Sequence, residues 1–120
     1  MITRIGTVAV YVSNPDAALR FWTQQVGFEL KSERPMTEST RWLEVAPPGA
    51  DTALVLYPKA IMDDWEARKP SVVFVVDDIE GTCDRLARNG VTFSQSLVDM
   101  AWGKFAAFVD TEGNEFGLRT

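Results

Sequence analysis

The pattern of apolar and polar residues divides the chain into two similar halves. In the first half, residues 7–12 form an apolar, β-branched run, which predicts a strand. Asn14 and Pro15 follow it, and a capping side chain before a first-turn proline predicts the start of a helix. Apolar residues then recur at helical spacing as far as Val26, and Gly27 predicts the end of this helix.

The same order of elements recurs in the second half. Residues 71–76 predict a strand and residues 79–89 a helix that is capped by Asp77 or Asp78 and ended by Gly90. Three more strands are predicted after each helix, at residues 28–33, 40–46 and 52–57 in the first half and at 92–94, 104–109 and 115–119 in the second. The sequence therefore predicts an α+β fold of two tandem βαβββ modules.

The predicted boundaries fit one domain. Module one covers about residues 1–58 and module two about residues 71–120, with a linker over residues 59–70. Ile61, Met62 and Trp65 give this linker a short apolar stripe that indicates one or two helical turns. A length of 120 residues is typical of a single domain, so we expect residues 1–120 to form one.

Composition and charge exclude several classes of function. The chain is 46% hydrophobic and 24% charged, which is ordinary for a globular protein. Its net charge of -5 argues against a nucleic-acid partner, because phosphate binding requires a basic surface. No apolar run is long enough to span a bilayer, so we expect no membrane partner. A single cysteine, Cys83, excludes an internal disulfide framework and favours a cytoplasmic location.

The chain contains no histidine. This excludes Ser-His-Asp and Cys-His catalytic arrangements and every metal site that needs a histidine ligand. A metal ion would have to bind oxygen ligands, and a general acid or base would have to be Asp, Glu, Lys, Tyr or Cys.

Several short motifs resemble the vicinal oxygen chelate superfamily, which includes glyoxalases, bleomycin-resistance proteins and extradiol dioxygenases. They are Val10–Asn14, Val26–Phe28, Phe74–Glu80, Phe108–Asp110 and Glu112–Phe116, and together with the repeat they cover nearly the whole chain. The resemblance implies a glyoxalase/bleomycin-resistance fold, in which the two modules form an incomplete curled barrel around a cavity. It also implies a homodimer, which agrees with the open strand edges that such modules leave.

The resemblance further implies where metal ligands would lie. Metal-dependent relatives carry them on the first and last strands of each module, and the matching positions here are Thr7, Leu54, Ser71 and Gly117. None of these residues is a plausible ligand of a catalytic divalent metal, so we expect no metal and no cofactor. Metal-dependent glyoxalase or dioxygenase activity is not expected either.

A carboxylate-only metal site is the alternative. Glu115 shares a strand face with Gly117, and Glu44 lies on the third predicted strand. If both reached the cavity, they could hold Mg²⁺ or Mn²⁺ together with water.

Several side chains are candidates for lining a ligand-binding cavity. Strand alternation predicts that Thr7 and Tyr11 face the cavity while Val10 faces the helix. Trp102 either borders the cavity or packs in the core or at a dimer seam, and Arg41 either binds an anionic ligand or lies on the surface. The full set of candidates is Thr7, Tyr11, Arg41, Leu54, Ser71, Trp102, Glu115 and Gly117.

Two classes of function remain open on this evidence. The first is a metal-free homodimer that binds a small, antibiotic-like molecule and performs no chemistry. The second is a lyase, isomerase or dioxygenase of the same superfamily that is cofactor-free or uses a carboxylate-only metal site. A structural or regulatory dimer is neither supported nor excluded, and the sequence does not identify the ligand.

Overall fold

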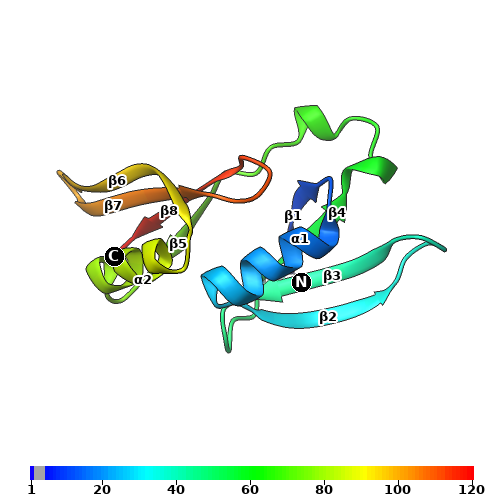
Figure 1. Cartoon of the computed structure of the whole chain (residues 1–120), viewed down its shortest axis with the longest axis horizontal. Helices are drawn as coiled ribbons and strands as arrows, with labels where there is room; N and C mark the ends of the chain where they lie inside the picture. The colour runs from blue at the N-terminus through cyan, green and yellow to red at the C-terminus, as the bar shows by residue number, and fades with distance from the viewer. Residues whose placement is uncertain (2–4) are drawn as a thin grey trace. The chain divides into compact units, whose positions relative to one another are not determined.

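A computed structural model describes residue 1 and residues 5–120 (Figure 1). The chain forms two compact units, Met1–Pro70 and Ser71–Thr120. Residues 59–70, the predicted linker, belong to the first unit. Two short 3-10 turns, Lys59–Ile61 and Trp65–Ala67, occupy this linker, as its apolar stripe predicts.

The first unit is a curled four-stranded sheet with one helix packed on it. Its elements are β1 (Thr7–Val12), α1 (Pro15–Arg20), a π-helical segment (Phe21–Val26), β2 (Glu29–Pro35), β3 (Arg41–Ala46) and β4 (Ala53–Pro58). The strand order is β1-β4-β3-β2. β1 pairs with β4 in parallel and the other neighbours are antiparallel.

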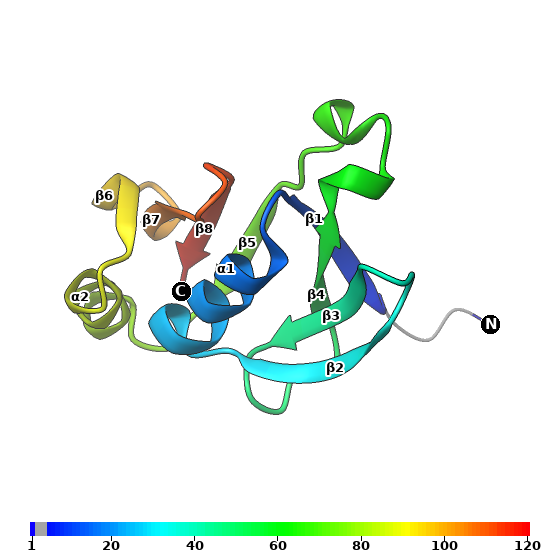
Figure 2. The ribbon, with the colours of Figure 1, turned by 45° about the vertical axis from the view of Figure 1, so that its right-hand side comes forward.

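The second unit repeats this plan. It contains β5 (Val72–Val75), α2 (Ile79–Arg88), β6 (Thr92–Met100), β7 (Gly103–Val109) and β8 (Glu115–Arg119), in the strand order β5-β8-β7-β6. β5 pairs with β8 in parallel, as β1 does with β4. Neither sheet closes into a barrel, and the bend of β2 and β3 is visible in Figure 2. The predicted α+β fold of two βαβββ modules is confirmed.

The helix of the first unit starts as the sequence predicts but ends differently. Asn14 accepts a hydrogen bond from the Ala17 amide at 3.0 Å, and Pro15 occupies the first turn. The last six residues form a π-helix where a continuous α-helix was predicted. This wider segment begins with two consecutive aromatic residues, Phe21 and Trp22, that are both buried. Gly27 ends it in the left-handed conformation with φ 96°.

Each sheet packs one face against its helix. In the first unit the fully buried side chains of this face alternate along β1 and β3 and continue on β4 (Val10, Val12, Leu43, Val45 and Leu56). In the second unit Phe74, Phe108 and Phe116 stack at centroid distances of 5.7–6.3 Å, and Ile79 and Leu86 of α2 are buried. The opposite face of each sheet is therefore the one left for other contacts.

Candidate ligand-binding faces

A row of large side chains crosses the first sheet on the face opposite α1. Arg34 of β2 pairs in register with Trp42 of β3, and Tyr57 of β4 pairs with Tyr11 of β1. The Tyr57 ring links the two pairs, with ring centroids 6.2 Å from Trp42 and 5.6 Å from Tyr11, both edge-on. The Arg34 guanidinium lies 5.4 Å from the centroid of the Trp42 ring. We call these four residues the aromatic row.

Glu44 lies beside the aromatic row. It is two residues from Trp42 on β3, so both side chains leave the same face of the sheet. The indole Nε1–H of Trp42 donates a hydrogen bond of 2.6 Å to Oε2 of Glu44. Both side chains are half-buried, and the bond fixes the orientation of the indole ring relative to the carboxylate.

Arg68 of the linker interacts with the opposite end of the row. Its Nε donates to Asp64 Oδ1 at 2.9 Å, and this hydrogen bond is the main reason that the pKa of Arg68 is raised. The phenol of Tyr11 adds to the same shift. The same hydrogen bond from Arg68 lowers the pKa of the Asp64 carboxyl group.

The strand register separates two of the expected site residues. Thr7 pairs with Ala53, and it is exposed on the same face as Tyr11. Leu54 pairs with Val8, so it lies on the helix face and is only 4% exposed. The resemblance implies that Thr7 and Leu54 lie at one metal site. Side chains that are paired in a parallel ladder leave the same face of the sheet, so Leu54 shares its face with Val8 and not with Thr7. Thr7 and Leu54 therefore do not share a face.

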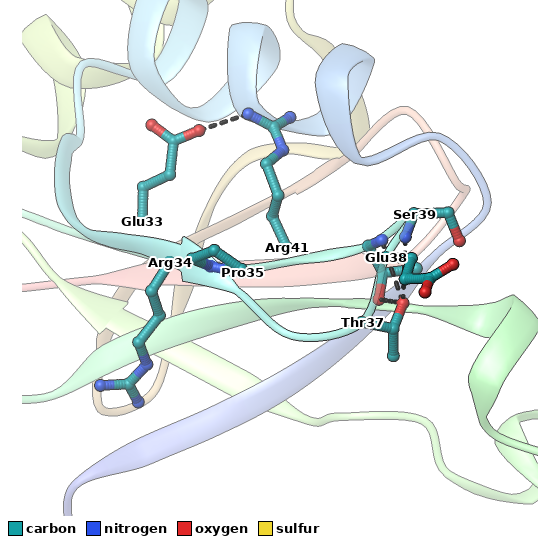
Figure 3. Close-up of a pocket in the computed structure, with 8 residues that line it drawn as sticks. Glu33, Arg34, Pro35, Thr37, Glu38, Ser39 and Arg41 are labelled. Atoms are coloured by element: carbon teal, nitrogen blue, oxygen red, sulfur yellow. Dashed lines mark hydrogen bonds and ion pairs between the residues drawn. The ribbon is translucent and has the colours of Figure 1, made fainter.

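Arg41 also lies on the helix side of the first sheet. It forms ion pairs with Glu33 of β2 and with Asp16 in the first turn of α1. Figure 3 shows Arg41 and Glu33 on one side of the β2–β3 hairpin and Arg34 on the other. A hollow of about 480 Å³ lies at this hairpin, lined by residues between Glu33 and Arg41. The Arg41 guanidinium, a candidate for binding an anionic ligand, is thus already paired with two carboxylates.

In the second unit, Gly117 lies under an aromatic ring on the face opposite α2. It pairs with Val73 of β5 and Ala107 of β7. A methyl group at Gly117 would lie 3.0 Å from Cε1 of Phe105 and 3.1 Å from Cγ2 of Val73. Trp102 is 59% exposed and packs edge-on against Phe105, with centroids 6.0 Å apart. Trp102 is thus a surface residue of its unit, beside the ring that covers Gly117.

The remaining candidates of the second unit, Ser71 and Glu115, are exposed. Ser71 lies one residue before β5. Glu115 of β8 accepts a hydrogen bond of 3.1 Å from the Ser94 hydroxyl.

Cys83 is half-buried on α2, and burial raises the pKa of its thiol, with Asp84 and Glu80 adding to the shift. A raised pKa keeps this thiol protonated at neutral pH, which disfavours a role as a nucleophile.

The metal positions implied by the resemblance offer few donor atoms. Thr7 and Ser71 have hydroxyl groups, Leu54 is a hydrocarbon and Gly117 has no side chain. Glu44 and Glu115, the carboxylates of the alternative site, belong to different units. Among residue 1 and residues 5–120, no group of three or more Cys, Asp or Glu side chains is placed to hold a metal ion.

Comparison with known proteins decides the family. A model of the Glyoxalase/Bleomycin resistance protein/Dioxygenase superfamily matches residues 4–118. The chain belongs to this superfamily. The resemblance that the short motifs indicate is confirmed, and so is the curled, open fold that it implies.

In the described part of the chain, no helix combines the length and apolarity that a membrane span requires.

Individual proteins are similar to this chain over almost their full length. YetH of Bacillus subtilis (strain 168), an uncharacterised protein, is 49% identical, and the alignment covers 99% of each chain. The crystal structure of TnmS3, an antibiotic binding protein from Streptomyces sp. CB03234, is 35% identical with a TM-score of 0.83, covering 98% of this chain and 95% of that one. A superfamily member from Sphaerobacter thermophilus DSM 20745 is 29% identical with a TM-score of 0.87, covering 98% and 97%.

The sequence pattern predicts only part of the candidate site. The sequence pattern predicts that Tyr11 faces a cavity and offers Glu44 as a metal ligand. No sequence signal indicates Tyr57 or Arg34. Alternation within one strand shows that Trp42 and Glu44 share a face. Tyr57 and Arg34 join them only because of the order and register of the strands, which the sequence of one strand does not determine.

Proposed function

We propose that this protein binds a planar aromatic small molecule on the face that carries the aromatic row. The observation behind this proposal is the cluster of Trp42, Tyr57 and Tyr11 on the sheet face that α1 leaves uncovered. Trp42 and Tyr57 are half-buried, so part of each ring is accessible while the rest is held by neighbours. Rings held in this way bind flat ligands at a low cost in side-chain entropy.

The relatives support an antibiotic-like ligand. TnmS3 is described as an antibiotic binding protein and is 35% identical to this chain over nearly its whole length. A shared fold alone does not carry function from one protein to another, so the aromatic row is the main support for the proposal.

We also propose that binding needs no metal ion. Leu54 and Gly117 provide no side-chain donor atom, and Leu54 lies on the helix face. Two hydroxyl groups alone are poor ligands for a divalent cation, which favours carboxylate oxygens, imidazole or thiolate.

Titration with three acridines of the same ring size tests the proposal. We would measure the affinity of acridine, 9-aminoacridine and acridine-9-carboxylate by isothermal titration, with and without EDTA. Trp42→Leu should weaken binding about tenfold or more, because the stacking of one ring on an aromatic side chain contributes roughly 1–3 kcal/mol. EDTA should leave the affinity unchanged.

The matched control is Trp65→Leu, which removes a tryptophan from the linker and keeps the row. This variant should bind as the wild type does. If none of the three acridines binds, or if binding disappears in EDTA, the proposed function is wrong.

A further inference from the structure

Glu44 is an acidic side chain that forms a hydrogen bond with a member of the aromatic row. One of its carboxylate oxygens, Oε2, accepts the Trp42 indole N–H at 2.6 Å. This hydrogen bond uses one acceptor site and holds the carboxylate in place. A carboxylate has about four acceptor sites on its two oxygens, so capacity for further hydrogen bonds remains.

No cation of the described residues neutralises Glu44. Its described interaction is the hydrogen bond from Trp42, and no lysine or arginine of residues 5–120 forms a salt bridge with it. The side chain is also half-buried. A carboxylate that is partly removed from water gains free energy from a charged hydrogen-bond donor, which makes Glu44 a favourable partner for a cation.

Arg34 of the row and Arg68 of the linker carry positive charges that act in the opposite direction. Arg68 is paired with Asp64 at 2.9 Å, so its charge is largely balanced. Arg34 is exposed, and its guanidinium lies over the Trp42 ring. Water and salt screen an exposed charge more strongly than a half-buried one. The Glu44 carboxylate should therefore have the larger effect on a ligand held against Trp42 and Tyr57.

We propose that Glu44 selects, among planar aromatic ligands, those that carry a positively charged N–H donor at the edge of the ring. This proposal rests on the proposed function, because the ring of the ligand is held by the aromatic row. The rings provide affinity for flat molecules in general, and Glu44 distinguishes cationic from neutral and anionic ones.

The test compares the same three acridines on wild-type protein and on Glu44→Gln. At pH 7.5, 9-aminoacridine is a cation with N–H donors, acridine is neutral and acridine-9-carboxylate is an anion. Wild-type protein should prefer 9-aminoacridine to acridine. Glu44→Gln should weaken 9-aminoacridine about tenfold or more, since hydrogen bonds to charged groups contribute roughly 1.5–3 kcal/mol. The affinity for acridine should change by less than about twofold, because glutamine can still accept the Trp42 N–H.

Glu38→Gln is the matched control, because it makes the same charge change in the turn of the same hairpin, where Glu38 is exposed. It should leave all three affinities unchanged. Raising the NaCl concentration should also reduce the preference of the wild-type protein for 9-aminoacridine, and this readout needs no variant.

The outcomes separate the two proposals. If no acridine binds to the wild type, the proposed function fails and the role of Glu44 fails with it. If the acridines bind but Glu44→Gln retains the preference for 9-aminoacridine, or if acridine-9-carboxylate binds most tightly, only the role of Glu44 is overturned.

Discussion

At the scale of single residues, Gly117 shows how one missing side chain shapes a face of the second unit. Its backbone lies directly beneath the ring of Phe105 and beside Val73. Phe105 in turn contacts Trp102. The absence of a Cβ at position 117 therefore determines where two aromatic rings lie.

Gly117→Ala should destabilise the protein by about 1–3 kcal/mol, the usual cost of overpacking. The added methyl group would lie 3.0 Å from the Phe105 ring and 3.1 Å from Val73, so both side chains must move. Thermal unfolding followed by circular dichroism measures the change. Gly6→Ala is the control, since a methyl group there meets nothing within 4 Å. Equal melting temperatures for the two variants would contradict this account.

The residue scale also shows the limit of prediction for the site. Alternation along residues 7–12 places Tyr11 opposite Val10, and the structure has these side chains on opposite faces of β1. The resemblance implies that Leu54 lies at a metal position with Thr7, and the strand register places Leu54 on the helix face. A shift of one residue reverses the face of a side chain, and the sequence of one strand does not determine its register with another.

At the scale of elements, an ion-pair cluster connects α2 to the second sheet. Lys104 of β7 lies 2.8 Å from Glu80 of α2 and 3.7 Å from Asp99 of β6. The hydrogen bond from Lys104 lowers the pKa of Glu80, and the same bond raises the pKa of Lys104. Glu80 and Asp99 are exposed and Lys104 is partly exposed, so the cluster should contribute little to stability and less at high salt.

Removing this ion pair with Glu80→Gln should make the stability of the protein less dependent on acidic pH. Because the pKa of Glu80 is lower in the folded than in the unfolded protein, its contribution is complete above the unfolded pKa. It is lost as the pH falls through the folded pKa. The wild type should therefore be slightly more stable than the variant at pH 7, and the two should converge towards about pH 3.

Urea unfolding at several pH values measures this difference. Glu66→Gln, the same charge change in the linker, should give no such convergence. A gap between wild type and Glu80→Gln that stays constant down to about pH 3 would show that another interaction of Glu80 is responsible.

The elements themselves were largely predictable. β1 and β8 have the predicted bounds, and Asn14 and Gly27 act at the positions that their residue types indicate. β6 was predicted to end at residue 94 but continues to Met100, because pairing with β7 holds a polar segment in the ladder. Local propensity does not contain this information, since the pairing partner is distant in sequence.

At the scale of the whole molecule, the open strand edges predict association. Each sheet has two edge strands, β1 and β2 in one unit and β5 and β6 in the other. In the second unit several large apolar side chains are exposed as well, among them Val73, Val75 and Trp102. Exposed edges and apolar surface of this kind are usually covered by a partner.

We therefore expect a homodimer of the 13.4 kDa chain at micromolar concentration. Sedimentation equilibrium measures the mass directly, and Val75→Lys should shift the population towards the monomer if this surface is part of the interface. Arg88→Glu, on the exposed side of α2, is the control for a change of surface charge. A monomer at micromolar concentration would contradict the expectation.

The parallel pairing of the first strand with the last in each unit has a consequence for synthesis on the ribosome. Thr7 pairs with Ala53 and Val72 with Phe116, so each first strand is made long before its neighbour in the sheet. A nascent chain that stops before Ala53 contains the apolar β1 strand without β4, the strand that pairs with it. Unpaired apolar strands promote aggregation. We therefore expect the nascent chain to be prone to aggregation in the interval between the synthesis of β1 and that of β4.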